Sequence, residues 1–259
     1  MEKVTFPKVG NKHTFHLLYD VGTIFGSDKK ILKLPKRAVF IYGEMLQEAL
    51  NNELKLREDR VLANYIVNAK CFRSKVGNIM VVSLNIGAPL TAVVAEELIS
   101  LGVREFLILG SAGSLNKNLR LGKLVLCTKA VRDEGTSHHY LRNSVFVAPD
   151  IKLNNRLAEF AKLHKIELRK GITWTTDAPY METQQELDYY RMLGVSTVEM
   201  EVAALFAVAK KRKVRASAIF AISDILGPNS PSRISKNKRI FLKYSYSLMA
   251  KIARCFSKL

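Results

Sequence analysis

Short runs of aliphatic and β-branched residues alternate with longer helical patterns along this chain, and this alternation constrains the fold more than any other feature. Such alternation is typical of an α/β fold, in which helices cover a central sheet. The predicted strands are residues 38–42, 79–84, 106–109, 124–128, 172–175 and 216–222. The predicted helices are residues 44–56, 90–101, 152–164, 183–193, 199–211 and 238–257.

The chain has 259 residues, enough for one large α/β domain with its own core. We find no internal repeat, low-complexity segment or Pro/Gly/Ser-rich linker, so we expect a single domain over residues 1–259. In the last predicted helix, Ile240, Tyr244, Leu248 and Ile252 recur every four positions. This spacing predicts that these four side chains form one buried stripe.

Composition limits the classes of protein to which this chain can belong. Its apolar runs are all shorter than the roughly 20 residues that a membrane helix needs, and its first 15 residues lack the apolar core of a signal peptide. We therefore expect a cytoplasmic protein without a membrane partner. Cys71, Cys127 and Cys255 form no CxxC pair, which predicts free thiols and no zinc site. We expect no metal or other cofactor.

The chain carries a formal net charge of +18. A large positive charge either attracts polyanions or anionic substrates, or is a solvated basic surface. The segment from Ile225 to Leu259 contains no Asp or Glu, whereas its basic residues are Arg233, Lys236, Lys238, Arg239, Lys243, Lys251, Arg254 and Lys258. Residues 210–213 are also all basic, but they lie between an apolar helix and an apolar strand, where a charged turn is expected. A role for the basic C-terminus cannot be assigned from these residues.

Two motifs place polar groups beside apolar elements. Gly110, Ser111, Ala112 and Gly113 follow the strand 106–109 and read as a turn. The N–H groups of such a turn can bind an anion or a sugar hydroxyl, although many such turns are only tight connections.

The second motif is Glu199, Met200 and Glu201, at the start of the helix 199–211. A carboxylate near a helix N-terminus is stabilised by the helix dipole, which is one explanation for both acids. The helix that follows is nearly all apolar and is therefore expected to be buried. Buried charges need partners, and the vicinal hydroxyls of a sugar are suitable ones.

Three further polar residues follow or end predicted strands. Asp224 comes just after the strand 216–222, where α/β sheets bind ligands, but it is also suited to cap a helix. Arg132 lies in a polar segment after the strand 124–128. Tyr180 lies in an aromatic segment that either stacks on a base or packs in the core.

In their order along the chain, these motifs resemble those of the nucleoside phosphorylase family, and most of all its uridine phosphorylase-like branch. The matching segments are residues 85–90, 110–113, 132–137, 176–180, 198–201 and 223–224. The resemblance implies a three-layer α/β/α fold with a central mixed sheet. It also implies a pentosyltransferase of nucleotide salvage that binds a nucleoside and assembles as a dimer or a hexamer.

The resemblance assigns expected roles to single residues. In the family, the acid that matches Glu201 holds the 2′ and 3′ hydroxyls of ribose, Met200 packs on the sugar, and Glu199 lies toward the base. Purine-cleaving members protonate the base with an aspartate that matches Asp224, so we expect an apolar setting around it. Tyr180 falls where an aromatic residue contacts the nucleoside. The residues 110–113 and Arg132 complete the expected binding site.

Two departures from the family pattern leave the acceptor of the sugar open. Ile108 and Gln47 stand where phosphorolytic members carry arginines, and an arginine supplies bidentate contacts to phosphate. Members that use water lack these arginines, and Glu48 falls where they keep a water-activating glutamate. Phosphorolysis to free base and ribose 1-phosphate, with phosphate as co-substrate, is favoured by the branch. Hydrolysis is favoured by the two departures.

The base preference also stays open. Thr183 and Gln185 replace the Gln and Arg that read uracil in uridine phosphorylases, and Asp224 favours a purine, whereas the Arg132 segment favours the uridine branch. A third hypothesis is that the protein is not an enzyme but a nucleotide- or nucleic-acid-binding module that has kept the fold. Its support is the +18 charge alone, and we expect no nucleic-acid partner because Glu199, Glu201 and Asp224 are retained.

Overall fold

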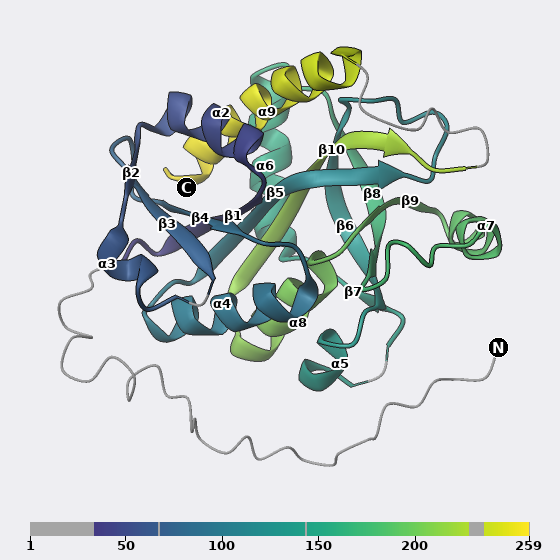
Figure 1. Cartoon of the computed structure of the whole chain (residues 1–259), viewed down its shortest axis with the longest axis horizontal. Helices are drawn as coiled ribbons and strands as arrows, with labels where there is room; N and C mark the ends of the chain where they lie inside the picture. Colours follow the sequence, from purple (N-terminus) through teal and green to yellow (C-terminus); the bar gives the residue numbers. More distant parts are fainter. Residues whose placement is uncertain (1–33, 67, 143, 228–235, 259) are drawn as a thin grey trace.

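A central mixed sheet with helices on both faces forms the protein in the computed structural model (Figure 1). The structure describes residues 34–66, 68–142, 144–227 and 236–258. Its strands are β1 (Arg37–Tyr42), β2 (Leu56–Glu58), β3 (Ala69–Ser74), β4 (Met80–Leu84), β5 (Glu105–Ser114), β6 (Leu124–Asp133), β7 (Phe146–Val147), β8 (Leu168–Thr176), β9 (Val195–Glu199) and β10 (Arg215–Ile225). Its helices are α2 (Glu44–Leu54), α3 (Arg60–Ala63), α4 (Ala88–Ser100), α5 (Ser137–Tyr140), α6 (Ile151–Leu163), α7 (Gln184–Met192), α8 (Val202–Arg212) and α9 (Lys236–Phe256).

The strands follow the order β10-β6-β8-β9-β5-β1-β4-β3-β2, and β10 also pairs with β5. This extra pairing closes β5, β10, β6, β8 and β9 into a ring. The strands β1, β4, β5 and β10 run parallel where they pair, whereas β6 runs antiparallel to β10. The carboxyl ends of β1, β5 and β10 therefore lie at the same edge of the sheet.

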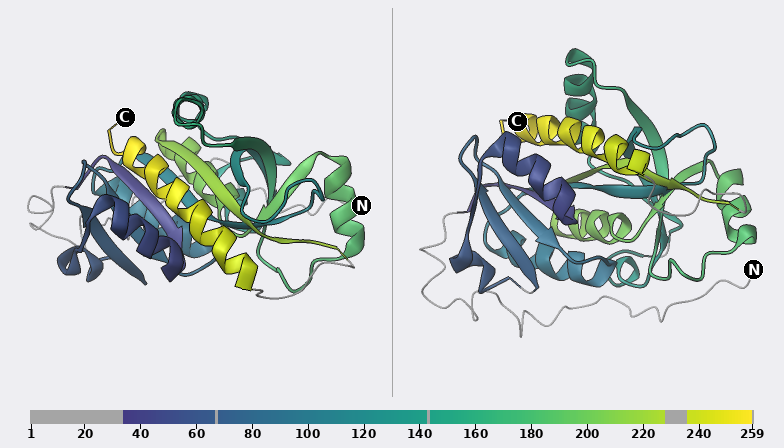
Figure 2. Two further views of the ribbon diagram at one scale, coloured as in Figure 1. Left: turned by 90° about the horizontal axis from the view of Figure 1, so that it is seen from above. Right: turned by 45° about the horizontal axis from the view of Figure 1, so that its top comes forward.

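The helices divide into two layers around this sheet. The side chains of α4 and α8 pack in one core cluster, and those of α2, α6 and α9 pack in another (Figure 2). β1 shows why the sheet has two cores, because its residues from Ala38 to Ile41 are fully buried and point alternately to the two faces. The expected three-layer α/β/α architecture with a central mixed sheet is confirmed.

Each predicted strand and helix is present, and the structure adds the short elements β2, β3, β7, β9, α3 and α5. The predicted start of the helix at Glu199 is wrong, since residues 195–199 form β9 and α8 begins at Val202. The predicted turn at residues 110–113 is also wrong. These residues continue β5 and pair in parallel with β10, so that Gly110 lies opposite Phe220.

The last helix is confirmed, but its predicted buried stripe is wrong. Ile240 and Tyr244 are 64% and 67% exposed, and only Ile252 of the four residues is fully buried. A strict four-residue spacing drifts around a helix of 3.6 residues per turn. The face that meets the core instead mixes spacings of three and four, and its members are Leu242, Ser245, Tyr246, Met249, Ala250, Ile252, Ala253 and Phe256.

Other expectations from composition can be compared with the described residues. The three cysteines are free thiols, as expected. The basic run 210–213 forms the last turn of α8 and its C-cap, where Lys213 takes the left-handed conformation at φ 57°. The chain therefore turns there between the helix and β10, as predicted. None of the helices in the described ranges is long and apolar enough to cross a membrane. The predicted absence of a signal peptide concerns residues outside those ranges.

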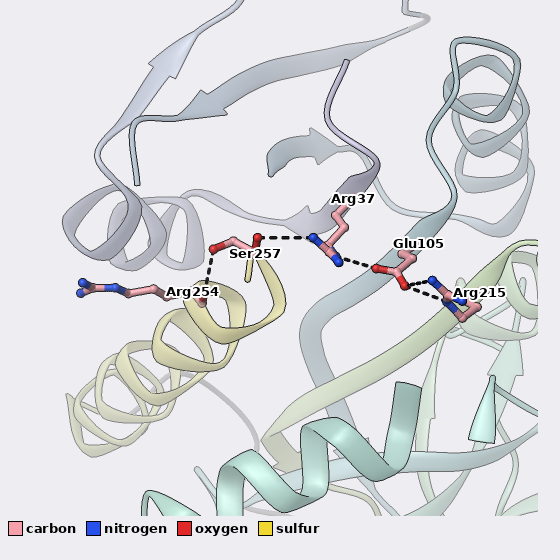
Figure 3. Close-up of polar contacts among 5 residues, drawn as sticks. All are labelled: Arg37, Glu105, Arg215, Arg254 and Ser257. Atoms are coloured by element: carbon pink, nitrogen blue, oxygen red, sulfur yellow. Dashed lines mark hydrogen bonds and ion pairs between the residues drawn. The ribbon is translucent and has the colours of Figure 1, made fainter. Parts of the chain in front are cut away.

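A buried carboxylate joins three strands at the edge of the sheet where β1, β5 and β10 begin (Figure 3). Glu105 has a side chain only 3% exposed and accepts hydrogen bonds from Arg37 Nε at 2.6 Å and Arg215 Nε at 2.7 Å. Arg37 also donates to the backbone carbonyl of Ser257, just beyond α9. The network thus ties the last helix to the start of the sheet.

Candidate active site

Glu201 lies between β9 and α8, at the edge of the sheet opposite Glu105. Its side chain is buried, with the residue 6% exposed, because the apolar helix that follows it is packed on all sides. Glu201 Oε1 accepts the backbone N–H of Gly87 at 2.7 Å, and Gly87 directly precedes α4. The backbone just before α4 therefore fixes the carboxylate, and its second oxygen accepts the neighbouring N–H of Met200 at 3.2 Å.

Glu199 caps the helix α8. Its Oε2 accepts the backbone N–H groups of Glu201 at 2.7 Å and Val202 at 2.8 Å, and its Oε1 accepts the hydroxyl of Thr175 at 2.5 Å. These contacts satisfy N–H groups that a helix start otherwise leaves without partners. The structure thus directs this carboxylate into the first turn of α8, where the helix dipole also stabilises it. The expected position of Glu199 toward the base stays a prediction.

The two buried carboxyl groups influence each other. Burial and then the charge of Glu201 raise the pKa of Glu199 to about 8, against the hydrogen bonds from Thr175 and the helix N–H groups. Burial raises the pKa of Glu201 to about 7, against the N–H groups of Gly87 and Met200. Together the pair holds more protons near neutral pH than two free glutamates would.

This pair predicts a pH dependence of stability. Because the folded protein keeps protons that the unfolded chain loses above about pH 4.5, the stabilisation is complete at low pH and is lost as pH rises toward about 8. Between pH 5 and pH 8, we expect the free energy of unfolding of Glu199→Gln to fall about 1 to 3 kcal/mol less than that of the wild type. Urea unfolding at both pH values measures this difference, and parallel losses in the two proteins would contradict it.

The glycine-rich end of β5 lies against the end of β10. A β-bulge between Ile222 and Asp224 turns the Asp224 side chain so that it faces Gly113 in β5. A Cβ atom at Gly113 would lie 3.1 Å from Asp224 Oδ2 and 3.1 Å from Val198 Cγ1, so a larger residue there would crowd both side chains. The structure therefore brings two of the predicted site segments together.

The setting of Asp224 differs from the apolar one that we expected. The residue is half-buried, and Ser223 Oγ donates a hydrogen bond to its Oδ1 at 2.5 Å. Apolar side chains approach on one side, where Val198 and Leu226 converge on Gly113. Asp224 is not a helix cap, since it lies within β10.

Glu182 is a residue of this region that the sequence analysis missed. It lies in the segment before α7 and is half-buried. Burial, followed by repulsion from Asp224 and Glu186, raises the pKa of Glu182 to about 7. Arg191 holds this helix in place by donating to the carbonyls of Leu115 and Leu226. The carboxyl edge of the sheet is therefore more acidic than the motifs indicated.

Ser111 and Ala112 lie between the two glycines of this stretch. Ala112 is buried, whereas Ser111 is exposed and bonds to the hydroxyl of Tyr246 in α9. A contact with the last helix was not predicted, because Tyr246 stands in no recognisable motif. Gly110, the first residue of the stretch, packs under the ring of Tyr42, since a Cβ there would lie 3.7 Å from Tyr42 Cδ2.

The guanidinium group of Arg132 makes its hydrogen bonds within the protein. Its guanidinium is buried, and its N–H groups bond to Ser137 Oγ at 2.9 Å and to the carbonyls of Ser137, Leu141 and Arg142 at 2.8 to 3.2 Å. One Nη also donates to Ser144 Oγ at 2.9 Å. All five guanidinium N–H groups therefore have acceptors, and Arg132 shapes this loop instead of offering a free donor to a substrate.

Two other predicted site residues have surroundings unlike those of Glu201. Glu48 faces a groove of about 300 Å³ between α2 and α9, beside Lys243 and Lys251, and none of the other predicted site residues lines it. Tyr180 is 99% exposed. The structure therefore excludes Tyr180 from the core, and its contact with a nucleoside stays a prediction.

A hydroxyl pair that no motif indicated completes the surroundings of Glu201. Tyr42, the last residue of β1, bonds to the hydroxyl of Thr91 in α4 at 2.8 Å. Burial, followed by the negative charge of Glu201, raises the pKa of Tyr42 well above its usual value, so the phenol stays neutral. Within the described residues, no group of three or more His, Cys, Asp and Glu side chains is placed to hold a metal ion.

Comparison with known proteins gives consistent matches over most of the chain. The family model described as the phosphorylase superfamily matches residues 43–253. A guanosine phosphorylase of Halorubrum lacusprofundi is 32% identical over 149 residues, and a uridine phosphorylase of Thermococcus kodakarensis is 31% identical over 157 residues. These matches cover 58% and 56% of this chain and span only 62% and 57% of the two relatives.

A solved structure shows the same fold. The 5′-methylthioadenosine/S-adenosyl homocysteine nucleosidase of Campylobacter jejuni superimposes with a TM-score of 0.72 at 24% sequence identity. The superposition covers 87% of this chain and 100% of that chain. Proteins of this fold thus bear the names of both phosphorylases and a nucleosidase.

Proposed function

Because the chain belongs to the phosphorylase superfamily, we propose that it is an enzyme that cleaves the N-glycosidic bond of a nucleoside. The observation that carries this proposal is the buried carboxylate of Glu201, which Gly87 holds through one oxygen, while among the described residues the other oxygen bonds only to the adjacent backbone. A carboxylate fixed in this way can accept two hydrogen bonds from vicinal sugar hydroxyls. Its negative charge also stabilises a ribosyl group that becomes cationic as the bond breaks.

The leaving base needs a proton, and we propose that Asp224 supplies it. This side chain stands at the carboxyl end of β10 beside Gly113, and the bond from Ser223 fixes its orientation. General acid catalysis of this kind contributes about 100- to 10 000-fold to a rate. We further propose that Met200 packs on the sugar and that Tyr180, fully exposed, covers the nucleoside when it binds.

Phosphate is the acceptor that the relatives' names support, since both named relatives are phosphorylases. On that reading, the products are free base and ribose 1-phosphate, and phosphate is a co-substrate. A specific observation favours water as the second candidate acceptor. Ile108 is 1% exposed within β5, so the position of the family's arginine is filled by an apolar core residue.

The names of the relatives divide between a purine and a pyrimidine, guanosine and uridine. Asp224 supports a purine, because a purine can be protonated on its ring as it leaves. As in the family, we propose an oligomer that acts in nucleotide salvage in the cytoplasm. Size-exclusion chromatography with light scattering tests the assembly.

A product assay tests the reaction. Purified protein is incubated with a panel of purine and pyrimidine ribonucleosides and 5′-methylthioadenosine, with and without phosphate. We expect release of free base, together with ribose 1-phosphate or ribose according to the acceptor. Mass spectrometry distinguishes the two sugar products. If no nucleoside is cleaved under either condition, the proposal is wrong.

A further inference from the structure

Ser111 is the one exposed residue of β5, because the other nine residues of this strand are all buried. β5 continues past the end of its pairing with β1, in which Ile41 is the last residue and lies opposite Leu109. From Gly110 onward, β5 therefore no longer has β1 beside it. The end of this pairing leaves Ser111 open at the carboxyl edge of the sheet, so a ligand can reach it.

Ser111 faces the same side of the strand as Asp224. Side chains two residues apart in a strand point to the same face, about 7 Å from each other, so positions 111 and 113 share a face. A Cβ atom at Gly113 would lie 3.1 Å from Asp224 Oδ2, which places the Asp224 carboxylate on that face. The serine hydroxyl and the proposed general acid therefore line the same face of the proposed site.

The hydroxyl of Tyr246 in α9 bonds to Ser111 from within the core. Tyr246 is only 7% exposed, and it packs in the cluster that contains Leu107 and Leu109, which share a face of β5 with Ser111. Burial raises the pKa of Tyr246, so the phenol keeps its proton. A buried O–H group needs an acceptor. Among the described residues, Ser111 is the one hydrogen-bond partner of this hydroxyl, so Tyr246 donates to Ser111 Oγ.

This direction of donation decides where the proton of Ser111 points. Because Tyr246 occupies one lone pair of Ser111 Oγ from the core side, the serine proton is directed away from α9, toward the exposed side. A hydroxyl that accepts one hydrogen bond is also a stronger donor in the next. Ser111 is thus prepared to donate to an oxygen of a bound substrate, whereas the buried Tyr246 acts only through Ser111.

The helix that carries Tyr246 is held on the sheet at two points. Beside Tyr246, Ser245 Oγ donates to the carbonyl of Gly122 at 2.5 Å. Just beyond the helix, the carbonyl of Ser257 accepts a hydrogen bond from Arg37 (Figure 3). A polar group in a site keeps its geometry when the residue that supports it is itself fixed. The tyrosine hydroxyl is therefore a fixed support for Ser111.

We infer that Tyr246 is a positioning residue of the proposed active site, which holds the Ser111 hydroxyl as a hydrogen-bond donor to the ribosyl end of the substrate. The inference rests on the proposed cleavage of a nucleoside. Since Asp224 serves the base in that proposal, a group two residues back along β5 meets the sugar end. The atom that accepts the bond is an oxygen with free lone pairs, either of the sugar or of the acceptor that attacks C1′.

A double-mutant cycle tests whether Tyr246 acts through Ser111. The variants are Tyr246→Phe, Ser111→Ala and their combination, and kcat and KM are measured for a cleaved nucleoside with and without phosphate. Phenylalanine keeps the ring in the core, and Ser111 is exposed, so both single variants are expected to fold. The matched control is Tyr244→Phe, which removes a phenol hydroxyl from the same helix at a residue that is 67% exposed.

We expect Tyr246→Phe to lower kcat/KM by about three- to tenfold, the effect of one hydrogen bond, and Ser111→Ala to lower it by at least as much. In the Ser111→Ala background, Tyr246→Phe should change kcat/KM by less than about 1.5-fold, and so should Tyr244→Phe in the wild type. A higher KM for the nucleoside assigns the accepting oxygen to the sugar. A higher KM for phosphate, or a lower kcat in hydrolysis, assigns it to the acceptor.

Other outcomes overturn the inference in distinguishable ways. Wild-type kinetics in Ser111→Ala would show that this hydroxyl does not contact the substrate. Wild-type kinetics in Tyr246→Phe, or equal losses from this change with and without the Ser111 hydroxyl, would leave Tyr246 a purely structural role. A wild type that cleaves no nucleoside, with or without phosphate, overturns the proposed function and the inference together.

Discussion

Replacing Glu201 by glutamine is expected to lower kcat/KM for a ribonucleoside by about 100- to 1000-fold. Glutamine has the same shape, and its amide oxygen can still accept the N–H of Gly87 that now holds Glu201 Oε1 at 2.7 Å. It loses the charge and one of the two acceptor oxygens that would face the 2′ and 3′ hydroxyls. Charge-assisted hydrogen bonds contribute about 1.5 to 3 kcal/mol each. Losing one of them and the charge on the other is expected to cost about 3 to 4 kcal/mol, which corresponds to this range.

The substrate supplies the control for this prediction. A 2′,3′-dideoxynucleoside lacks both hydroxyls, so Glu201→Gln should change its kcat/KM much less than that of the ribonucleoside. The difference between the two losses measures the contact itself, as in a double-mutant cycle. Glu201→Ala should be at least as damaging on the ribonucleoside, because it also leaves the Gly87 N–H without its acceptor. Near wild-type activity in Glu201→Gln would remove Glu201 from the ribose site.

The location of the site could be predicted from the sequence because parallel strands end at the same edge of a sheet. Asp224 and the stretch 110–113 both follow strongly apolar runs, and the structure places Asp224 against Gly113. This contact depends on the pairing of β10 with β5. The order of strands in a sheet cannot be read from a local stretch of sequence, so the contact could not be predicted. The motifs therefore identified the edge, but not which side chains meet there.

The chemistry of single residues was harder to predict for the same reason. Arg132 reads as a free cation in the sequence, yet the loop after α5 folds back and occupies its donors with carbonyls and hydroxyls. Tyr42 and Thr91 stand 49 positions apart and match no motif, so only the packing of α4 beside β1 brings their hydroxyls together.

The start of α8 shows how a local pattern misled the prediction. Residues 195–208 are mostly apolar, with Ser196, Thr197, Glu199 and Glu201 as the polar ones, and a mostly apolar run does not distinguish a buried strand from a buried helix. The β-branched residues of 195–198 belong to β9, and the chain bends at Met200 before the helix begins. That bend is what separates the two acids, so that Glu199 caps the helix while Glu201 turns toward Gly87.

Buried acids have different partners at the two edges of the sheet. At the carboxyl edge, Glu199 and Glu201 are buried together and bond to N–H groups and hydroxyls. At the amino edge, Glu105 is buried between the guanidinium groups of Arg37 and Arg215. An acid without a cation costs stability when it ionises, whereas an acid between two cations stabilises the fold as long as both partners remain. The first arrangement suits catalysis, and the second suits a structural role.

Glu105→Ala is therefore expected to have the largest effect on stability, with a loss of about 3 kcal/mol in the free energy of unfolding. The variant leaves two like charges facing each other where β1, β5 and β10 begin, and Arg37 is itself only 20% exposed. Urea unfolding followed by circular dichroism measures the loss.

Glu167→Ala is the matched control, because Glu167 also bridges two cations, Lys123 and Arg169, but is 53% exposed. Exposed ion pairs contribute about 0 to 1 kcal/mol, so this variant should unfold within about 1 kcal/mol of the wild type. The same carboxylate is removed in both variants, so a larger loss in Glu105→Ala isolates the effect of burial. Equal losses would mean that the surrounding water screens the Glu105 network as fully as it screens a surface pair.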